Sequence, residues 1–364
     1  MSRVRMRSRV LAVTVAATSL ILGGSAAAGA RPAPIGQDRY VVGKPYRGDF
    51  PDPSLLRVGS RWFAYATMTA GLNLPVLTST DLRHWRVAGP RRAAVPDALA
   101  KLPAWARTHR AGDRSVGVVW APTVVRLRDG RFADVYSVRQ GRKKMCISVA
   151  RSSRAAGPFV DRSRTPLLCP PRGVIDPAIY REAGGTYLLY KTEDAAHGQP
   201  TRLWIRALKP GLRAFAEPTA HLLLRADPDT WENGVIEAPS MIRYAGRRYL
   251  FYSGNGWARA GYSTGYAICP TVTGPCSRPV IAGVPHPERL LRSDDTRVGP
   301  GGASAFLDTA GRLRLAFHAW TPGAAHYPKS VACRTRPTGC GQRRMHLALL
   351  TADANGILGV RSEY

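Results

Sequence analysis

The chain has 364 residues, a formal net charge of +29 at pH 7 and 45% hydrophobic residues. A chain of this length can bury a sizeable core, and it has room for one large β domain or two ordinary domains. A basic balance would suit an anionic partner, but arginine and lysine are scattered and no block of five like charges appears. We therefore interpret the charge as solvated loop surface and expect no nucleic-acid partner.

Residues 1–30 read as a secretory signal peptide. Four arginines precede an apolar run over residues 10–23, and Ala28-Gly29-Ala30 offers a cleavage site. That run is short for a membrane span, and no later apolar stretch approaches the length that a span needs; a retained N-terminal anchor is the alternative. We expect export, a polar linker over residues 31–44, and a secreted mature protein with no membrane attachment once the signal is cleaved.

Five blocks in the mature part repeat one pattern of residues. Each block is followed by a short apolar stretch, a polar turn with glycine, and a second apolar run that ends near an aromatic residue. The period between these closing aromatics is 71, 54, 62 and 65 residues, which is typical of a solenoid, a propeller or an array of domains. The blocks are Asp52-Pro53-Ser54, Trp120-Ala121-Pro122, Asp176-Pro177-Ala178, Glu237-Ala238-Pro239 and Gly301-Gly302-Ala303.

Short apolar runs bounded by glycine, proline and charged turns predict strands and hairpins throughout the chain. Hairpins are expected over residues 55–66, 180–188 and 242–253, each followed by a more polar stretch that could supply two outer strands. An insertion over residues 97–107 is expected to be helical. Four strands in each of five repeats predict an all-β fold, a five-bladed β-propeller that forms a single catalytic domain over residues 45–364. A β-sandwich is the alternative, but it does not explain the shared block.

Three of the blocks carry a carboxylate, and the pattern gives it the same place in each: Asp52, Asp176 and Glu237. In a propeller the innermost strand of each blade lines the central channel, so residues at the start of these strands gather at one mouth of the channel. Two carboxyl groups flanking a bond suit glycoside hydrolysis, and a third nearby raises the pKa of the proton donor by repulsion. A lone acid at this place would be interpreted as a structural cap, whereas three indicate an active site.

The six cysteines all lie in the mature part. In an exported chain an even number predicts three disulfides, and pairs that span a short turn with proline and glycine are expected to close locally. Zinc binding is the alternative, although no Cys-x-x-Cys and no histidine at ligand spacing accompanies the cysteines. The predicted pairs are Cys269–Cys276, Cys333–Cys340 and, as the remaining two, Cys146–Cys169.

Four segments of the mature chain are distinctive: residues 48–54 (GDFPDPS), 174–178 (VIDPA), 235–240 (VIEAPS) and 298–304 (VGPGGAS), the last followed by Phe317-His318-Ala319-Trp320. Together they resemble the signature blocks of glycoside hydrolase family 43, in the family's order, and the similarity covers roughly residues 45–360. The resemblance implies a five-bladed propeller and a secreted, inverting hydrolase that acts on arabinose- or xylose-containing plant polysaccharides.

Carried over block by block, the resemblance implies a role for each acid. The general base falls on Asp52, the general acid on Glu237, and the acid that orients the donor and tunes its pKa on Asp176. Inversion implies a separation of roughly 6.5–9.5 Å between base and acid, which leaves room for a water molecule. Two positions depart from relatives in ways that could alter specificity: Thr123 stands where many have an acid, and Gly302 where some have a histidine.

The resemblance also suggests accessory residues. His318 matches a histidine that in several relatives contacts a central calcium ion or its water shell; a buried core histidine is the alternative, and no other cofactor is implied. Phe50, Trp120 and Trp257 lie beside motif residues and are expected to stack on sugar rings, because amphipathic rings suit sugar faces. Core packing is the alternative for each of the three.

Three other functions stay open beside an α-L-arabinofuranosidase or arabinanase, which the cysteine pattern and the last block favour. The first is a β-xylosidase of the same family. The second is a retaining, five-bladed fructoside hydrolase, whose usual asparagine-aspartate-proline-asparagine and arginine-aspartate-proline blocks are missing. The third is a non-catalytic carbohydrate-binding propeller, against which the intact set of acids argues. We expect a monomer whose partner is an oligo- or polysaccharide.

Overall fold

The computed structural model describes residues 45–69, 71–89, 97–111, 114–182, 184–323, 325, 327 and 341–361. These residues form strands, turns and irregular connections, and their helical content is one 3₁₀ turn, η1 (Asp194–His197). The predicted signal peptide and linker lie outside the described residues. Among the described residues, no helix is long and apolar enough to cross a membrane.

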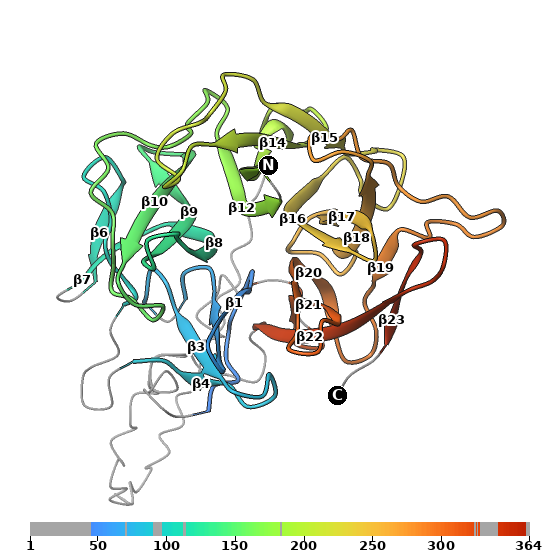
Figure 1. The fold of residues 1–364 in the computed structure, drawn as a ribbon, viewed down its shortest axis with the longest axis horizontal. Helices are drawn as coiled ribbons and strands as arrows, with labels where there is room; N and C mark the ends of the chain where they lie inside the picture. Colours follow the sequence, from blue (N-terminus) through green and yellow to red (C-terminus); the bar gives the residue numbers. More distant parts are fainter. Residues whose placement is uncertain are drawn as a thin grey trace, which may run out of the picture. The chain divides into compact units, whose positions relative to one another are not determined.

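Five sheets surround a common centre (Figure 1). Four have four strands in chain order, and the second has a fifth strand at its outer edge and a separate hairpin beside it. The first blade contains β1 (Ser54–Val58), β2 (Arg61–Tyr65), β3 (Val76–Ser79) and β4 (Arg86–Val87). The second contains β8 (Val119–Arg126), β9 (Phe132–Gln140), β10 (Lys144–Ser152), β11 (Phe159–Val160) and, at its outer edge, β5 (Leu99–Lys101), and the separate hairpin consists of β6 (Thr108–Ala111) and β7 (Arg114–Gly117). The others contain β12 (Val174–Glu182), β13 (Gly185–Thr192), β14 (Arg202–Leu208), β15 (His221–Arg225); β16 (Ile236–Tyr244), β17 (Arg247–Gly254), β18 (Ser263–Cys269), β19 (Arg289–Leu291); and β20 (Val298–Leu307), β21 (Leu313–Trp320), β22 (Arg343–Ala352), β23 (Leu358–Arg361).

The innermost strand of each blade is its first: β1, β8, β12, β16 and β20 (Figure 1). Each of these strands contacts the first strand of the next blade, and β20 contacts β1. The ring therefore closes between the first and last blades, and neither of these sheets borrows a strand from the other end of the chain. The predicted all-β, five-bladed propeller is confirmed.

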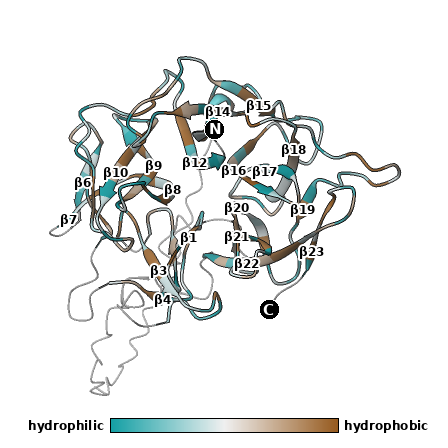
Figure 2. Ribbon diagram, in the orientation of Figure 1, coloured by the Kyte–Doolittle hydropathy of each residue, from teal (hydrophilic) through white to brown (hydrophobic). Residues whose placement is uncertain are grey.

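The second strands are buried on both faces, which explains why they read as continuous apolar runs. In β17, Leu250 and Tyr252 pack with residues of the third blade, while Tyr249 and Phe251 pack with residues of the fifth. Because side chains alternate across a strand, one strand contributes to two cores between blades. Figure 2 shows hydrophobic residues along the strands of the blades and hydrophilic ones in many of the connections.

The helix predicted over residues 97–107 is wrong. Leu99–Lys101 is the strand β5, which pairs in parallel with β11 at the outer edge of the second blade. The carboxylate of Asp97 accepts hydrogen bonds from the backbone N–H groups of Asn73 and Leu74 in the first blade. These tertiary hydrogen bonds outweigh a weak local helix preference.

Two of the predicted disulfides are confirmed. Cys146 of β10 is bonded to Cys169 in the connection to the third blade, and Cys269 at the end of β18 is bonded to Cys276. The third predicted pair, Cys333 and Cys340, lies outside the described residues.

Candidate active site

The five repeated blocks start the inner strands with one shared backbone distortion. One residue in each block has a left-handed conformation, with φ between 46° and 59°. In the second to fifth blades, the pairing register with the second strand shifts at this point, as it does at a β-bulge. Such a conformation is strained by about 1–3 kcal/mol for a residue other than glycine, so it persists only where the surroundings fix it. The five bulge residues are Asp52, Ala121, Asp176, Ala238 and Gly302.

The bulge corrects the predicted alignment of the three acids by one residue. Asp52 and Asp176 occupy the bulge position, but in the fourth blade that position belongs to Ala238, and Glu237 precedes it. The sequence pattern aligned the three carboxylates, whereas the left-handed backbone conformation aligns Asp52, Asp176 and Ala238. Glu237 therefore reaches the channel from a different backbone position, with a side chain longer by one methylene group.

A polar side chain from the preceding blade holds most of the bulges. In four of the five, the bulge N–H donates to a residue one or two positions after the closing aromatic of the preceding second strand. The pairs are Asp52 with His318 Nδ1 (3.1 Å), Ala121 with Thr67 Oγ1 (2.9 Å), Asp176 with Ser137 Oγ (3.0 Å) and Gly302 with Ser253 Oγ (2.9 Å).

Lys191 holds the corresponding position in the third blade, and an ammonium group cannot accept an N–H. The N–H of Ala238 instead donates to Oδ2 of Asp176 at 2.8 Å. The buried Lys191 pairs with Glu237 at 3.0 Å and with Glu193 at 2.9 Å. Sequence reasoning missed Lys191, although its place directly after Tyr190 in the repeat was a readable signal.

Glu237 lies between this cation and a phenol. Its Oε2 faces Lys191, its Oε1 accepts a hydrogen bond from the Tyr262 hydroxyl at 2.9 Å, and the residue is buried. Burial raises the pKa of Tyr262 well above its usual value, and the charges of Glu237, Asp52 and Asp176 add to that rise. Tyr262 therefore remains a hydrogen-bond donor, and all three predicted acids lie near its ring.

The surroundings of Asp52 favour its ionised, carboxylate form. Its Oδ1 lies 3.5 Å from Nη1 of Arg343 and 3.2 Å from Nδ1 of His318, and its Oδ2 accepts a hydrogen bond from the Thr67 hydroxyl at 2.6 Å. Burial would raise the pKa of Asp52, but these three partners outweigh it and hold that pKa well below its usual range. The side chain is still 21% exposed, so it is an ionised group that solvent can reach.

Asp176 is shifted in the opposite direction. Burial raises the pKa of Asp176 well above its usual value, and the nearby charge of Glu237 raises it further, while Lys191 opposes both. The acids thus have different environments: Asp52 is stabilised as a carboxylate, and Asp176 is disfavoured as one. Pairs of carboxyl groups separated in this way are typical of acid–base catalysis.

Two glycines of the last block leave room for this cluster. A Cβ at Gly301 would lie 2.0 Å from Cε1 of Tyr262, and one at Gly302 would lie 2.5 Å from Oδ1 of Asp52. Since Gly302 also has a positive φ, any side chain there would displace Asp52 or His318. The departure noted at Gly302 in the sequence is therefore matched by close packing around Asp52.

The three predicted stacking residues have different surroundings. Trp257 is 41% exposed, stacks on Trp320 with ring centres 6.0 Å apart, and lies under the Arg343 guanidinium at 4.8 Å. Trp120, in β8, is partly buried. Phe50 is 1% exposed and packs in the core of the first blade, so its ring is not available to a sugar, in contrast to the expectation.

His318 does not fit a calcium site built from protein ligands. Its Nδ1 lies 3.1 Å from the backbone N of Asp52 and 3.2 Å from Oδ1 of the same residue, and burial lowers the pKa of His318. Calcium takes six to eight oxygen ligands, and the described residues include no group of three or more histidine, cysteine or acidic side chains placed to hold a metal. We therefore assign His318 to the support of Asp52.

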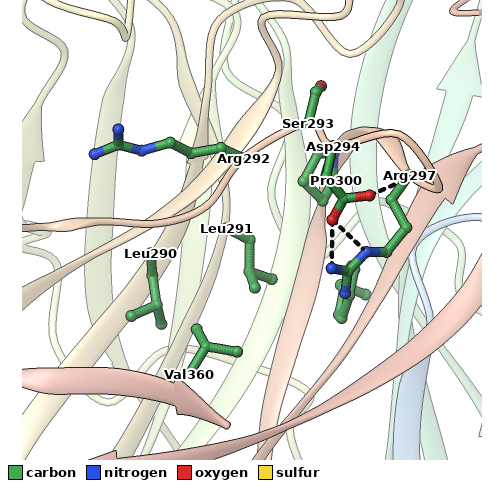
Figure 3. Close-up of a pocket in the computed structure, with 9 residues that line it drawn as sticks. Leu290, Leu291, Arg292, Ser293, Asp294, Arg297, Pro300 and Val360 are labelled. Carbon is green, nitrogen blue, oxygen red and sulfur yellow. Dashed lines mark hydrogen bonds and ion pairs between the residues drawn. The ribbon is translucent and has the colours of Figure 1, made fainter. Parts of the chain in front are cut away.

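A separate cavity of about 320 Å³ opens between the fourth and fifth blades (Figure 3). Leu290, Leu291 and Val360 form part of its apolar lining, and an ion pair between Asp294 and Arg297 lies at one side. None of the three acids lines this cavity. This cavity is therefore separate from the cluster of acids.

The comparison with known families agrees with this geometry. The model of glycosyl hydrolases family 43 matches residues 44–356. The chain belongs to this family. It is therefore a glycoside hydrolase of a family of inverting glycosidases, as the sequence blocks implied.

Individual known proteins share only limited sequence identity with this chain. An extracellular endo-α-(1→5)-L-arabinanase of Thermotoga petrophila is 30% identical over 116 residues, which are 30% of this chain and only 22% of that protein. A thermostable family-43 glycoside hydrolase is 24% identical with a TM-score of 0.66, over 89% of this chain and 95% of that chain. An α-L-arabinanase of Cellvibrio cellulosa in complex with arabinohexaose is 21% identical with a TM-score of 0.63, over 87% and 96%. The two structures establish the shared fold.

Proposed function

We propose that this family-43 hydrolase is secreted and cleaves α-L-arabinofuranosyl linkages of plant polysaccharides with inversion. Asp52 acts as the general base, Glu237 as the general acid, and Asp176 orients and tunes the acid. The observation that carries the proposal is the difference between two sites: Asp52 is held as a carboxylate by Arg343 (3.5 Å), whereas Glu237 shares its buried counter-ion with a second acid.

Asp52 suits the base because it is ionised and accessible. A carboxylate whose pKa lies below its usual range is fully charged at neutral pH. Its partial exposure lets a water molecule approach, and the base would take a proton from this water as the water attacks the sugar.

Glu237 suits the acid because its neighbours tolerate a change of its charge. Neutralising one member of a buried ion pair ordinarily leaves the other charge uncompensated, which costs several kcal/mol. Lys191 keeps Glu193 at 2.9 Å as a second counter-ion, so this cation stays paired when Glu237 acts as the general acid and gives its proton to the leaving oxygen. Tyr262 fixes the carboxyl group through its hydrogen bond of 2.9 Å.

Asp176 is placed to act on the acid. Its Oδ2 accepts the N–H of Ala238, the residue next to Glu237, at 2.8 Å. This bond ties Asp176 to the backbone beside Glu237, and the charges of the two acids act on each other, as the raised pKa of Asp176 indicates. Asp176 therefore acts as a positioning residue rather than as a group that exchanges a proton with the substrate.

The preference for arabinose is supported by relatives and by one surface. The Thermotoga petrophila and Cellvibrio cellulosa proteins are arabinanases, and Trp257 offers a partly exposed aromatic ring beside Arg343, which reaches Asp52. A β-xylosidase of the same family is the second candidate, and a non-catalytic carbohydrate-binding propeller is the third.

Proton NMR of digests of arabinan, arabinoxylan and xylo-oligosaccharides separates these candidates. We expect arabinose or arabino-oligosaccharides with inverted anomeric configuration as the first products. Xylose as the first product would establish the β-xylosidase, and tight binding without sugar release would establish the binding protein. Hydrolysis of sucrose or levan would instead support a fructoside hydrolase.

The acid is tested by Glu237→Gln. This variant should lose activity on natural linkages by about 10²–10⁴-fold, while substrates with a good leaving group are spared because they need no protonation. Glu217→Gln is a matched control, since Glu217 is 38% exposed. Full activity of Glu237→Gln on a natural oligosaccharide would contradict the assignment.

A further inference from the structure

The hairpin turns at the end of the propeller opposite the three acids share an arginine-rich composition. Each inner strand starts at the acid end and runs for five to ten residues before the turn into its second strand, so at about 3.3 Å per residue these turns lie roughly 15–30 Å away. We call the five turns the far face. They are residues 57–61, 126–131, 181–185, 243–248 and 308–314, and they contain eleven arginines and three acidic residues, a net charge of +8.

The connections between second and third strands at the opposite end are less basic. The second and third strands of the first four blades are joined near the acids by residues 66–75, 141–143, 193–201 and 255–262, which contain three basic and two acidic residues, a net charge of +1. The equivalent connection of the fifth blade lies largely outside the described residues. The fold thus collects arginines that are dispersed along the sequence into one set of turns.

The acids of the far face do not neutralise it. Asp129, Glu182 and Asp308 each form an ion pair of 2.7 Å with an arginine of the same face. Six further arginines are exposed and form no ion pair with a described residue. They are Arg57, Arg61, Arg126, Arg128, Arg181 and Arg247.

Two of these six belong to neighbouring blades whose inner strands, β8 and β12, contact each other. Arg128 is in the turn of the second blade and Arg181 is at the end of β12 in the third. Burial lowers the pKa of Arg181, and the charge of Arg128 lowers it further. Like charges that act on each other in this way favour an anion between them, which would relieve their repulsion.

We propose that the far face binds an acidic polysaccharide, a polymer of uronic acids, while the channel mouth acts on a neutral glycan. Guanidinium groups bind carboxylates through paired hydrogen bonds, and a polyuronate offers one carboxylate on each sugar. A single-stranded nucleic acid fits less well, because such sites also stack bases on aromatic rings. The five turns contain one aromatic residue, Tyr244, which is partly buried.

The test is binding of the full-length protein to immobilised polygalacturonate, with neutral arabinan as the comparison. Arg128→Ser/Arg181→Ser removes two charges from the far face, and Arg142→Ser/Lys143→Ser removes two from the exposed turn between β9 and β10 at the other end. We expect salt-sensitive binding of the wild type to polygalacturonate alone. We expect the far-face variant to bind roughly fivefold more weakly and the other variant to bind as the wild type does.

Three results would overturn the proposal: no binding of the wild type to polygalacturonate, equal weakening by the two double variants, or preferential binding of DNA at the same ionic strength. Release of sugar from a neutral arabino-oligosaccharide is measured on the same samples and should be equal in all three proteins. Because binding and hydrolysis are read separately, failure of the proposed hydrolase function leaves the test of the far face intact. Melting temperatures verify that each variant is folded.

Discussion

Arg343 provides the sharpest test of how the proposed base stays ionised. Its Nη1 lies 3.5 Å from Oδ1 of Asp52, and at that distance two unit charges attract each other by roughly 1 kcal/mol in water and roughly 5 kcal/mol at an effective dielectric constant of 20. One pKa unit corresponds to about 1.4 kcal/mol. Replacement by glutamine should therefore raise the pKa of Asp52 by about one to three units, since burial is then no longer outweighed.

The direction of the effect on activity follows from the role of Asp52. A base works as the carboxylate, so activity is lost as pH falls through its pKa, and a raised pKa moves this loss to higher pH. The measurement is kcat/KM for a neutral arabino-oligosaccharide between pH 3 and pH 8. The wild type should keep its activity down to the lowest pH at which it is folded, whereas Arg343→Gln should begin to lose activity at a pH about one to three units higher than the wild type does.

Two variants of the same strand serve as controls. Arg343→Lys retains a positive charge and should restore much of the wild-type profile. Arg344→Gln changes the next residue, which is exposed, and should leave the profile unchanged. An identical acidic limb in wild type and Arg343→Gln, with both proteins folded, would refute the reasoning.

Three further predictions concern single side chains of the site. Lys191→Met should lower kcat/KM on natural linkages roughly 100-fold, because Glu237 and Glu193 lose their shared cation. Lys209 is exposed, so the control Lys209→Met should have no effect. Equal kcat/KM values for the two variants would contradict the role of Lys191. Gly302→Ala should abolish most activity, because the new Cβ meets Asp52 at 2.5 Å, whereas Gly311→Ala, at a similar φ but with open space around it, should cost only about 1 kcal/mol of stability. Trp257→Ala should raise KM several-fold with little change in kcat if the ring holds a sugar; an unchanged KM would assign the ring to packing alone.

The repeat predicted the fold well because its period has a direct structural cause. A second strand packed on both faces needs apolar residues at every position, and a closing aromatic fills the space between two blades. Such runs, recurring five times, fixed the number of blades and the confirmed architecture. The helix predicted over residues 97–107 failed because β5 pairs with a strand that follows it by about sixty residues, and local preference carries no information about such pairing.

The candidate site was predictable as a set of acids but not in its register or its supports. The sequence pattern aligned Glu237 with Asp52 and Asp176, which occupy the bulge position, but in the structure Glu237 precedes the bulge by one residue. Sequence similarity does not report φ. Arg343 was missed since a lone basic residue in a strand of an arginine-rich chain has no distinguishing pattern, and Lys191 was marked only by its place after the closing aromatic Tyr190. The burial of Phe50 depends on neighbours such as Tyr46 and Leu72 in the folded blade, which motif proximity does not reveal.

The way the ring closes has a consequence for how the enzyme would fail. The first and fifth blades form a seam without a shared strand, held by contacts such as Phe50 N–H to Arg343 O at 2.7 Å and Ser304 Oγ to Pro53 O at 2.7 Å. Asp52 is on one side of this seam, and both His318 and Arg343 are on the other. Any opening of the seam by heat or by acid separates the proposed base from the groups that ionise it, while the interior of every blade is still intact. Loss of catalysis would then precede loss of the fold.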